Sequence, residues 1–354
     1  MPAFTGRLNS NEIFASLYNM IISQEVFADN IKGAFESLAD MSRVDGGLYG
    51  DTKLYYSADV LASNEWGNDA EALNLLALDR PDAPETQAIT LDKFRQIRLT
   101  VDNYLSKRAW STEGAFSSFN SVMLGMIRDT KKIYDATTFN AFIGTNEAGQ
   151  GDEGKAQDRT ITEVAEQNPA LTIAEDLAKL LVDLQDVGRD YNDYGHMRSY
   201  DESDFVVIWN SDFYTSLKKV DLPVIFHNEG LLDEFTQKVL PARYFGTINA
   251  AETQGNEDGT VRSLIEQTIG SRHYFAGDSI NIGDTAPAGT SYTEDPTIAY
   301  KVMHKRSVPF MSAFEVGTSF FNPRSLTENH YLTWGHNTFE HLKNYPFITA
   351  RYGG

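Results

Sequence analysis

A helical repeat of apolar residues after residue 112 constrains the fold more than any other feature of the sequence. The side chains that step by three or four along one face are Phe116, Phe119, Met123, Met126, Ile127, Thr130, Ile133 and Tyr134. Thr112 is a suitable N-cap, and Lys131 and Lys132 suit the negative C-terminal end of a helix. The pattern predicts a helix from Thr112 to Asp135, about 36 Å long at 1.5 Å per residue. That is long for a helix of a globular protein.

A basic segment precedes this helix, although the whole chain of 354 residues carries a formal charge of -20. Residues 89–110 hold five bases against two acids; the bases are Lys93, Arg95, Arg98, Lys107 and Arg108. From Ile97 to Asp102 apolar and polar residues alternate, as in a strand with one solvent-exposed face. Together with the strand pattern TKLYYSADV at residues 52–60, this predicts a long two-stranded excursion within residues 51–111. Because an isolated hairpin is marginally stable in water, the excursion needs another surface to hold it.

The first 50 residues also lack a core of their own. Ser10 can cap a helix whose apolar side is formed by Ile13, Phe14, Leu17 and Ile21. A segment that carries an apolar stripe and little else of its own to bury must pack on another surface. We therefore expect these four side chains to contact something outside the segment.

The rest of the chain alternates helices and strands, which favours an α+β fold. A capping box at Thr172 opens a leucine-rich stripe that ends at Gly188 and predicts a helix. The sequence FVVIW at residues 205–209 predicts a buried strand followed by a short helix, and residues 297–322 predict further strands. The expected loops are residues 246–260 and 283–296.

Three patterns resemble ligand sites, and each has a simpler interpretation. Residues 149–155 match most of the phosphate-binding loop GxxxxGK[ST], but Ala156 replaces the hydroxyl residue and two acids inside the loop would repel phosphate. Residues 190–201 resemble a calcium loop but lack an acid at its fifth position and the Glu at its twelfth, so a solvated acidic turn is expected. His336 and His341 are five residues apart, and we expect them to pack or to form hydrogen bonds.

Composition excludes several functional classes. Cysteine is absent, which rules out disulfides and thiolate chemistry. No segment approaches the roughly 18 consecutive apolar residues of a membrane helix, and no secretory signal is expected. The acidic balance disfavours a general nucleic-acid binder. Because no catalytic set stands out among the acids and histidines, we expect no catalytic residue, no cofactor and no metal site.

The order of the elements resembles that of the major capsid proteins of tailed bacteriophages, which have the Hong Kong 97-type fold. The segment ITLDKFRQIRLTVDNYLSKRAW looks like the E-loop of that family. TEGAFSSFNSVMLGMIRDTKKIYDATTFNAFIG looks like its spine helix, and DFVVIWNSDFYTSLKKV looks like the start of its A-domain. The resemblance implies an α+β fold with an N-terminal arm at 1–50, an E-loop region at 51–111, a P-domain with the spine helix at 112–170, an A-domain at 171–295, and return strands of the P-domain with the C-terminal segment at 296–354.

In that family the E-loop lies across the neighbouring subunit, so the resemblance implies two sets of residues that act between subunits. They are Lys93, Arg95, Arg98, Lys107 and Arg108 in the E-loop, and Ile13, Phe14, Leu17 and Ile21 in the arm.

The function implied by the resemblance is that of a major capsid protein, which assembles as hexamers and pentamers into an icosahedral shell around the genome. The expected partners are a separate scaffolding protein, a portal, a decoration protein and packaged DNA bound without sequence-specific contacts, with no membrane. We expect assembly in the bacterial host cytoplasm and a final location in the virion. An acidic wall suits this role because it would not hold the packed DNA. Two alternatives remain open, an encapsulin-type shell and a soluble hydrolase with an unrecognised pair of carboxylates.

Overall fold

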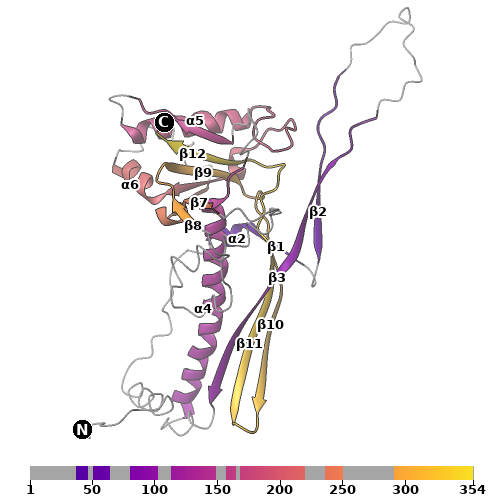
Figure 1. The fold of residues 1–354 in the computed structure, drawn as a ribbon, viewed down its shortest axis with the longest axis vertical. Coiled ribbons are helices and arrows are strands. Elements are labelled where there is room, and N and C mark those ends of the chain that lie inside the picture. Colours follow the sequence, from indigo (N-terminus) through magenta and orange to yellow (C-terminus); the bar gives the residue numbers. More distant parts are fainter. Residues whose placement is uncertain are drawn as a thin grey trace, which may run out of the picture.

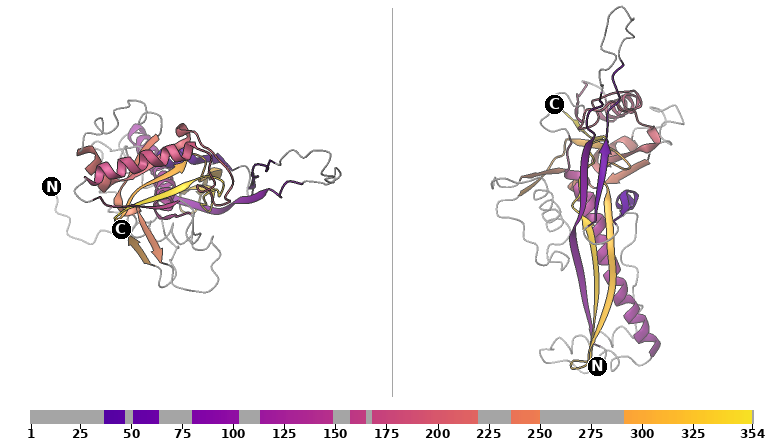
Figure 2. Two further views of the ribbon diagram at one scale, coloured as in Figure 1. Left: turned by 90° about the horizontal axis from the view of Figure 1, so that it is seen from above. Right: turned by 90° about the vertical axis from the view of Figure 1, so that its right-hand side faces the viewer.

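The computed structural model describes residues 37–46, 51–63, 80–102, 113–148, 157–164, 168–219, 236–249 and 291–353. The molecule is elongated, with a compact layer of sheet and helices at one end (Figure 1). Away from this layer run helix α4 (Glu113–Thr145) and strands β3 (Glu85–Asp102), β10 (Phe310–Asn322) and β11 (Thr327–Asn337). Two views at right angles show the three strands lying along the helix (Figure 2). With β2 (Thr52–Ser57), the first part of β3 forms a two-stranded ribbon that leaves the side of the body.

Helix α4 confirms the predicted long helix and continues ten residues beyond the expected end at Asp135. The sequence suggested an end there because Lys131 and Lys132 suit the negative C-terminal end of a helix, but Asp135 is buried and paired with two cations. Its Oδ2 lies 3.1 Å from Lys131 Nζ and 3.2 Å from Arg43 Nη2. Beyond it, residues 136–143 are buried in the compact layer. The helix is about 50 Å long at 1.5 Å per residue, so it links the two ends of the molecule.

A buried lysine closes the C-terminal end of α4. Lys301 Nζ donates to the backbone oxygens of Gly144 at 2.9 Å and Asn146 at 2.8 Å. Carbonyl groups at a helix end have no partner within the helix, and they carry partial negative charge. Lys301 lies on β9 (Ile298–His304), where burial lowers its pKa to about 7. This one side chain therefore fastens the long helix to the compact sheet.

The long sheet has the strand order β1-β10-β11-β3-β2, in which β1 is Arg43–Asp45. β3 pairs in antiparallel fashion with β2 over residues 85–90 and with β11 over residues 91–102. The pairing of β2 with β3 confirms a two-stranded excursion. The expectation that all of residues 89–110 belong to it is wrong for residues 91–102, which pair with β11 in the body of the protein. Residues 103–110 lie outside the described residues.

The compact layer contains a second five-stranded sheet whose strand order is β4-β12-β9-β5-β6. Its remaining strands are β4 (Asp158–Ile161), β12 (Phe347–Tyr352), β5 (Phe205–Asn210) and β6 (Thr236–Leu240). β5 confirms the predicted buried strand, since all six of its residues are buried. Alternate residues serve two cores because side chains alternate between the faces of a strand.

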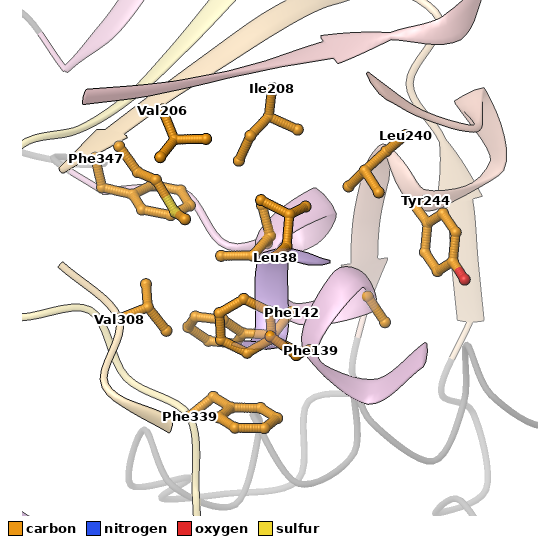
Figure 3. Close-up of a cluster of buried hydrophobic side chains, with 14 of the residues drawn as sticks. Leu38, Phe139, Phe142, Val206, Ile208, Leu240, Tyr244, Val308, Phe339 and Phe347 are labelled. Atoms are coloured by element: carbon orange, nitrogen blue, oxygen red, sulfur yellow. The ribbon is translucent and has the colours of Figure 1, made fainter. Parts of the chain in front are cut away.

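On one face of β5, Val206 and Ile208 pack with Phe139 and Phe142 of α4 (Figure 3). Phe139 stacks on Phe310 with ring centroids 5.8 Å apart. On the other face, β5 packs against the leucine stripe of α5 (Pro169–Gln185). The sheet is therefore covered on both faces, by the end of α4 and by α5.

Some local predictions need correction. The N-cap of α5 is Asn168, whose side chain accepts from the backbone N of Ala170, and not Thr172, which lies within the first turn. The short helix after β5 is α6 (Ser211–Lys219). Parts of the two expected loops form a two-stranded antiparallel sheet, made of β7 (Gly246–Asn249) and β8 (Ser291–Glu294). Helix α2 (Ser37–Ser42) and two short 3-10 turns, η2 (Glu202–Asp204) and η3 (Ala242–Tyr244), complete the described elements.

Candidate intersubunit surface

The β2–β3 ribbon has one face against the body and one face exposed. Tyr55 and Ile89 face inward, in a cluster with residues of the loop after β11. On the opposite face Leu54 is 55% exposed and Tyr56 is 65% exposed. In register with them on β3 lie Ala88 and Thr86, and the Thr52–Thr90 pair completes a face without charge. Large exposed apolar side chains on a projecting segment are typical of a contact surface.

The chain beyond β2 extends this apolar surface, since Val60 is 57% exposed and Leu61 is 76% exposed. Sequence reasoning missed these contact candidates because it followed charge. One signal was present, however. Leu54, Tyr55 and Tyr56 are three consecutive large side chains on a strand, so both faces of that strand must carry apolar surface.

The predicted basic residues lie on both faces of β3. Lys93 and Arg95 share the face of Ile97, while Arg98 lies on the exposed face, where its Nε donates to Gln96 Oε1 at 2.9 Å. The idea that this strand has no core is wrong, because Ile97 packs with the buried residues of α4 and β11. Contact of these bases with a neighbouring subunit stays a prediction.

Arg95 begins a directed chain of hydrogen bonds that joins β3, α4 and β11. Its Nε donates to Tyr134 Oη at 3.0 Å, and Tyr134 Oη lies 3.0 Å from His336 Nε2. His336 Nδ1 lies 2.8 Å from the backbone oxygen of Asn337, which can only accept, so Nδ1 carries the hydrogen. Burial lowers the pKa of His336 to about 4, so the ring is neutral and Nε2 accepts from Tyr134. This arrangement confirms the expectation that His336 packs and forms hydrogen bonds.

His341 is also held by hydrogen bonds, as expected. Its Nε2 lies 2.7 Å from Asp193 Oδ2, inside the segment that resembled a calcium loop. Asp193 Oδ1 also accepts from Gln157 Nε2 at 2.6 Å. Within the part of the chain that the structure describes, no group of three or more His, Asp or Glu is arranged to hold a metal ion.

A second exposed apolar region lies at the far end of the long sheet, where β10 turns into β11 (Figure 1). Phe320 is 61% exposed, Phe321 49% and Leu326 44%. Between this end and α4 is an open hollow of about 520 Å³. It is lined by Ile127, Arg128, Gly317, Thr318, Ser319, His330, Tyr331 and Leu332.

Several predicted residues lie outside the described residues. They are Lys107 and Arg108, the arm residues Ile13, Phe14, Leu17 and Ile21, and the phosphate-loop-like segment 149–156. Among the helices of the described ranges, none combines the length and the apolar composition needed to span a membrane.

A long helix packed on a long sheet, a ribbon that leaves the body and a separate compact layer define the Hong Kong 97-like class of capsid subunits. The family model of the Phi29-like phage major capsid protein matches residues 5–348, and the chain belongs to this family. It is a structural component of the virion of a tailed phage. The family assignment favours the phage capsid over the encapsulin alternative.

Solved structures agree on the fold. The chain is similar to a protein in the capsid structure of Staphylococcus phage Andhra, with a TM-score of 0.66 and 12% identity over 94% of this chain and 87% of that chain. It is also similar to a chain in the structure of head fiber and inner core protein gp22 of native bacteriophage P68, with a TM-score of 0.62 and 12% identity over 93% and 87% of the two chains. No curated protein sequence matches it.

Proposed function

We propose that the β2–β3 ribbon is the main contact through which these subunits form hexamers and pentamers and close an icosahedral shell around the genome. The observation that carries this proposal is the uncharged outer face of the ribbon, with Leu54 and Tyr56 more than half exposed. Burying two such side chains contributes about 1.5–3 kcal/mol each at full burial, and the contact repeats at every subunit. A repeated contact of modest strength suits a shell, because each subunit is held by several neighbours.

Further parts of the proposal concern the other partners and the charged residues. Arg98, exposed beside the ribbon, is proposed to meet an acid of a neighbour, and the arm stripe at Ile13, Phe14, Leu17 and Ile21 is proposed to pack on another subunit. A separate scaffolding protein, a portal and a decoration protein are proposed as partners during assembly in the host cytoplasm. The formal charge of -20 supports a wall that encloses packaged DNA without holding it and without sequence-specific contacts. The shell role needs no catalytic residue, and we propose none.

The test replaces the two apolar side chains of the ribbon with acids, in the variant Leu54→Glu, Tyr56→Glu. Because both side chains are exposed in the single subunit, the variant should fold normally but fail to form shells under electron microscopy. The matched control is Val182→Glu on α5, where the side chain is 62% exposed but lies on the compact layer. Normal shells from the double variant would refute the proposed role of the ribbon.

A further inference from the structure

We propose that a cluster of polar side chains, here called the latch, fixes the direction in which the β2–β3 ribbon leaves the body before subunits meet. It joins the end of β2 to the loop that follows α5 and to the turn before β12. The proposal rests on the function proposed above for the ribbon. The members of the latch are Ser57 and Asp59 on the ribbon, and Arg189, His196, Arg198 and Asn344 on the body.

Ser57, the last residue of β2, is buried, and its hydroxyl group uses its full hydrogen-bonding capacity. It donates to Asn344 Oδ1 at 2.7 Å and accepts from Arg198 Nη2 at 3.2 Å. Because its one hydrogen is used for Asn344, the contact with His196 Nδ1 at 2.8 Å requires that nitrogen to donate. The hydroxyl then donates once and accepts twice. A side chain with three partners on the body has one defined position.

The next two residues are held as well. Arg198 Nη2 donates to the backbone oxygen of Ala58 at 2.7 Å. Asp59 Oδ1 accepts from the backbone N of Met197 at 2.8 Å, and its Oδ2 pairs with Arg189 Nη1. The backbone hydrogen bond first, and Arg189 second, hold the pKa of Asp59 well below its usual range. Asp59 is therefore charged at any pH at which shells would assemble.

The loop that receives the ribbon is itself braced. Gly188 and Arg198 exchange two backbone hydrogen bonds, both of 2.9 Å, which close residues 188–198 into a ring. Inside it, the Asn192 side chain accepts from the backbone N of His196 at 2.9 Å and donates to its backbone oxygen at 2.7 Å. Gly195 turns the chain with φ of 67°, a conformation that favours glycine. The latch therefore has a stiff anchor on the body.

The ribbon needs such an anchor because of its place in the sheet. β2 is an edge strand that pairs only with β3 among the described strands, and a two-stranded ribbon bends and twists easily. Figure 1 shows it leaving the side of the body, so a small change of angle at Ser57 would move the described residues beyond it, 60–63 and 80–84. Fixing the angle in advance removes the entropy cost of ordering the ribbon during assembly. The latch thus acts on assembly without touching the neighbouring subunit.

The test measures the direction of the ribbon in the full-length subunit, kept unassembled. Because the chain has no cysteine, cysteines placed at the exposed residues Asp82 and Val182 are the only sites that a spin label can react with. The distance between the labels should have a narrow distribution in the parent protein. With Ser57→Ala, Asp59→Ala it should broaden on the order of twofold, because the ribbon gains freedom. Thr90→Ala, which removes a 3.0 Å hydrogen bond with Thr52 inside the ribbon, is the control and should leave the distribution narrow.

An unchanged distribution in the latch variant would overturn the proposal. If that double variant does not fold, Ser57→Ala and Asp59→Asn tested singly decide in the same way, since each removes part of the latch. Shell assembly of the latch variant should be slower on the order of tenfold. The Leu54→Glu, Tyr56→Glu variant separates the two proposals, because it should keep a narrow distribution and yet form no shells. Normal assembly of that variant would refute the ribbon's role while leaving the latch intact.

Discussion

Replacing Tyr134 with phenylalanine tests whether the long helix is attached to the long sheet by the directed hydrogen-bond chain. The substitution removes a single oxygen atom. The ring, which is 6% exposed and lies edge-on to Trp334 at a centroid distance of 5.7 Å, keeps its packing. Any loss of stability therefore reports on the hydrogen bonds alone.

The expected loss of stability depends on the two hydrogen-bonding partners that Tyr134 Oη leaves behind. His336 is buried, and its Nε2 would lose the donor that the structure gives it, which costs about 1–3 kcal/mol for a buried acceptor. Arg95 would lose the bond to Tyr134 Oη, but it is half-buried and can reach water, which adds roughly 0.5–1 kcal/mol. We expect Tyr134→Phe to lower the free energy of unfolding by about 1.5–4 kcal/mol.

Urea unfolding of the unassembled subunit at pH 7.5 measures this loss, and Tyr331→Phe on the same sheet is the control. Tyr331 is only half-buried, so its change should stay within about 0.5 kcal/mol. A loss below 0.5 kcal/mol for Tyr134→Phe, no larger than that of the control, would refute the stabilising role of the hydrogen bonds among Arg95, Tyr134 and His336.

The same variant gives a pH signature. Burial lowers the folded pKa of His336 to about 4, below the usual 6.5, so the unfolded state takes up the proton first as the pH falls. This contribution to stability is present above pH 6.5 and is lost between 6.5 and 4. Without Tyr134 Oη as donor to neutral Nε2, the pKa of His336 should rise. The difference in the free energy of unfolding between parent and variant should therefore shrink as the pH falls from 6.5 to 4. A constant difference would contradict the assigned tautomer of His336.

Three further predictions follow from the fold. Phe139→Ala should cost about 3–5 kcal/mol in urea unfolding, because the side chain is fully buried in the core that α4 shares with β5 and β10. Lys301 has a folded pKa lowered to about 7, so the unfolded state binds more protons between pH 7 and 10.5. The free energy of unfolding of the parent, relative to that of Lys301→Met, should thus rise with pH across that window. Urea unfolding of both proteins at pH 7 and 9.5 measures it. Arg95→Glu should destabilise the isolated subunit in thermal unfolding, whereas Arg98→Glu should leave its melting temperature unchanged and reduce the yield of shells.

Sequence patterns predicted the elements whose period is long and unbroken. The apolar repeat of α4 and the alternation at Ile97–Asp102 both reflect one continuous buried face, and both were found. What the alternation could not show is where β3 changes partner. Residues 85–90 and 91–102 have the same period, because a strand has the same pleat beside β2 and beside β11. The basic segment was therefore assigned wholly to the excursion, although most of its described part lies in the body.

The buried polar residues were beyond sequence reasoning for a different reason. Asp135 and Lys301 look like surface residues in a linear pattern, since such side chains are rarely buried without partners. Their partners come from distant parts of the chain, such as Arg43 for Asp135 and the end of α4 for Lys301. These contacts offset the cost of burying the charged group only when they form together. No local sequence pattern contains them, because the partners lie far apart along the chain.

The segment that imitates a calcium loop shows how one pattern can serve two structures. Closely spaced Asn, Asp and Gly residues bind cations, but they also bend the chain, because Asn and Asp bond to nearby backbone and Gly accepts positive φ. In this chain these residues bend the backbone. Asn192 and Gly195 shape the loop, Asp193 ties it to His341, and the resulting turn presents Arg189 to the ribbon. A variant that keeps the acids but replaces Gly195 should therefore disturb the direction of the ribbon more than one that removes Asp190, which is exposed.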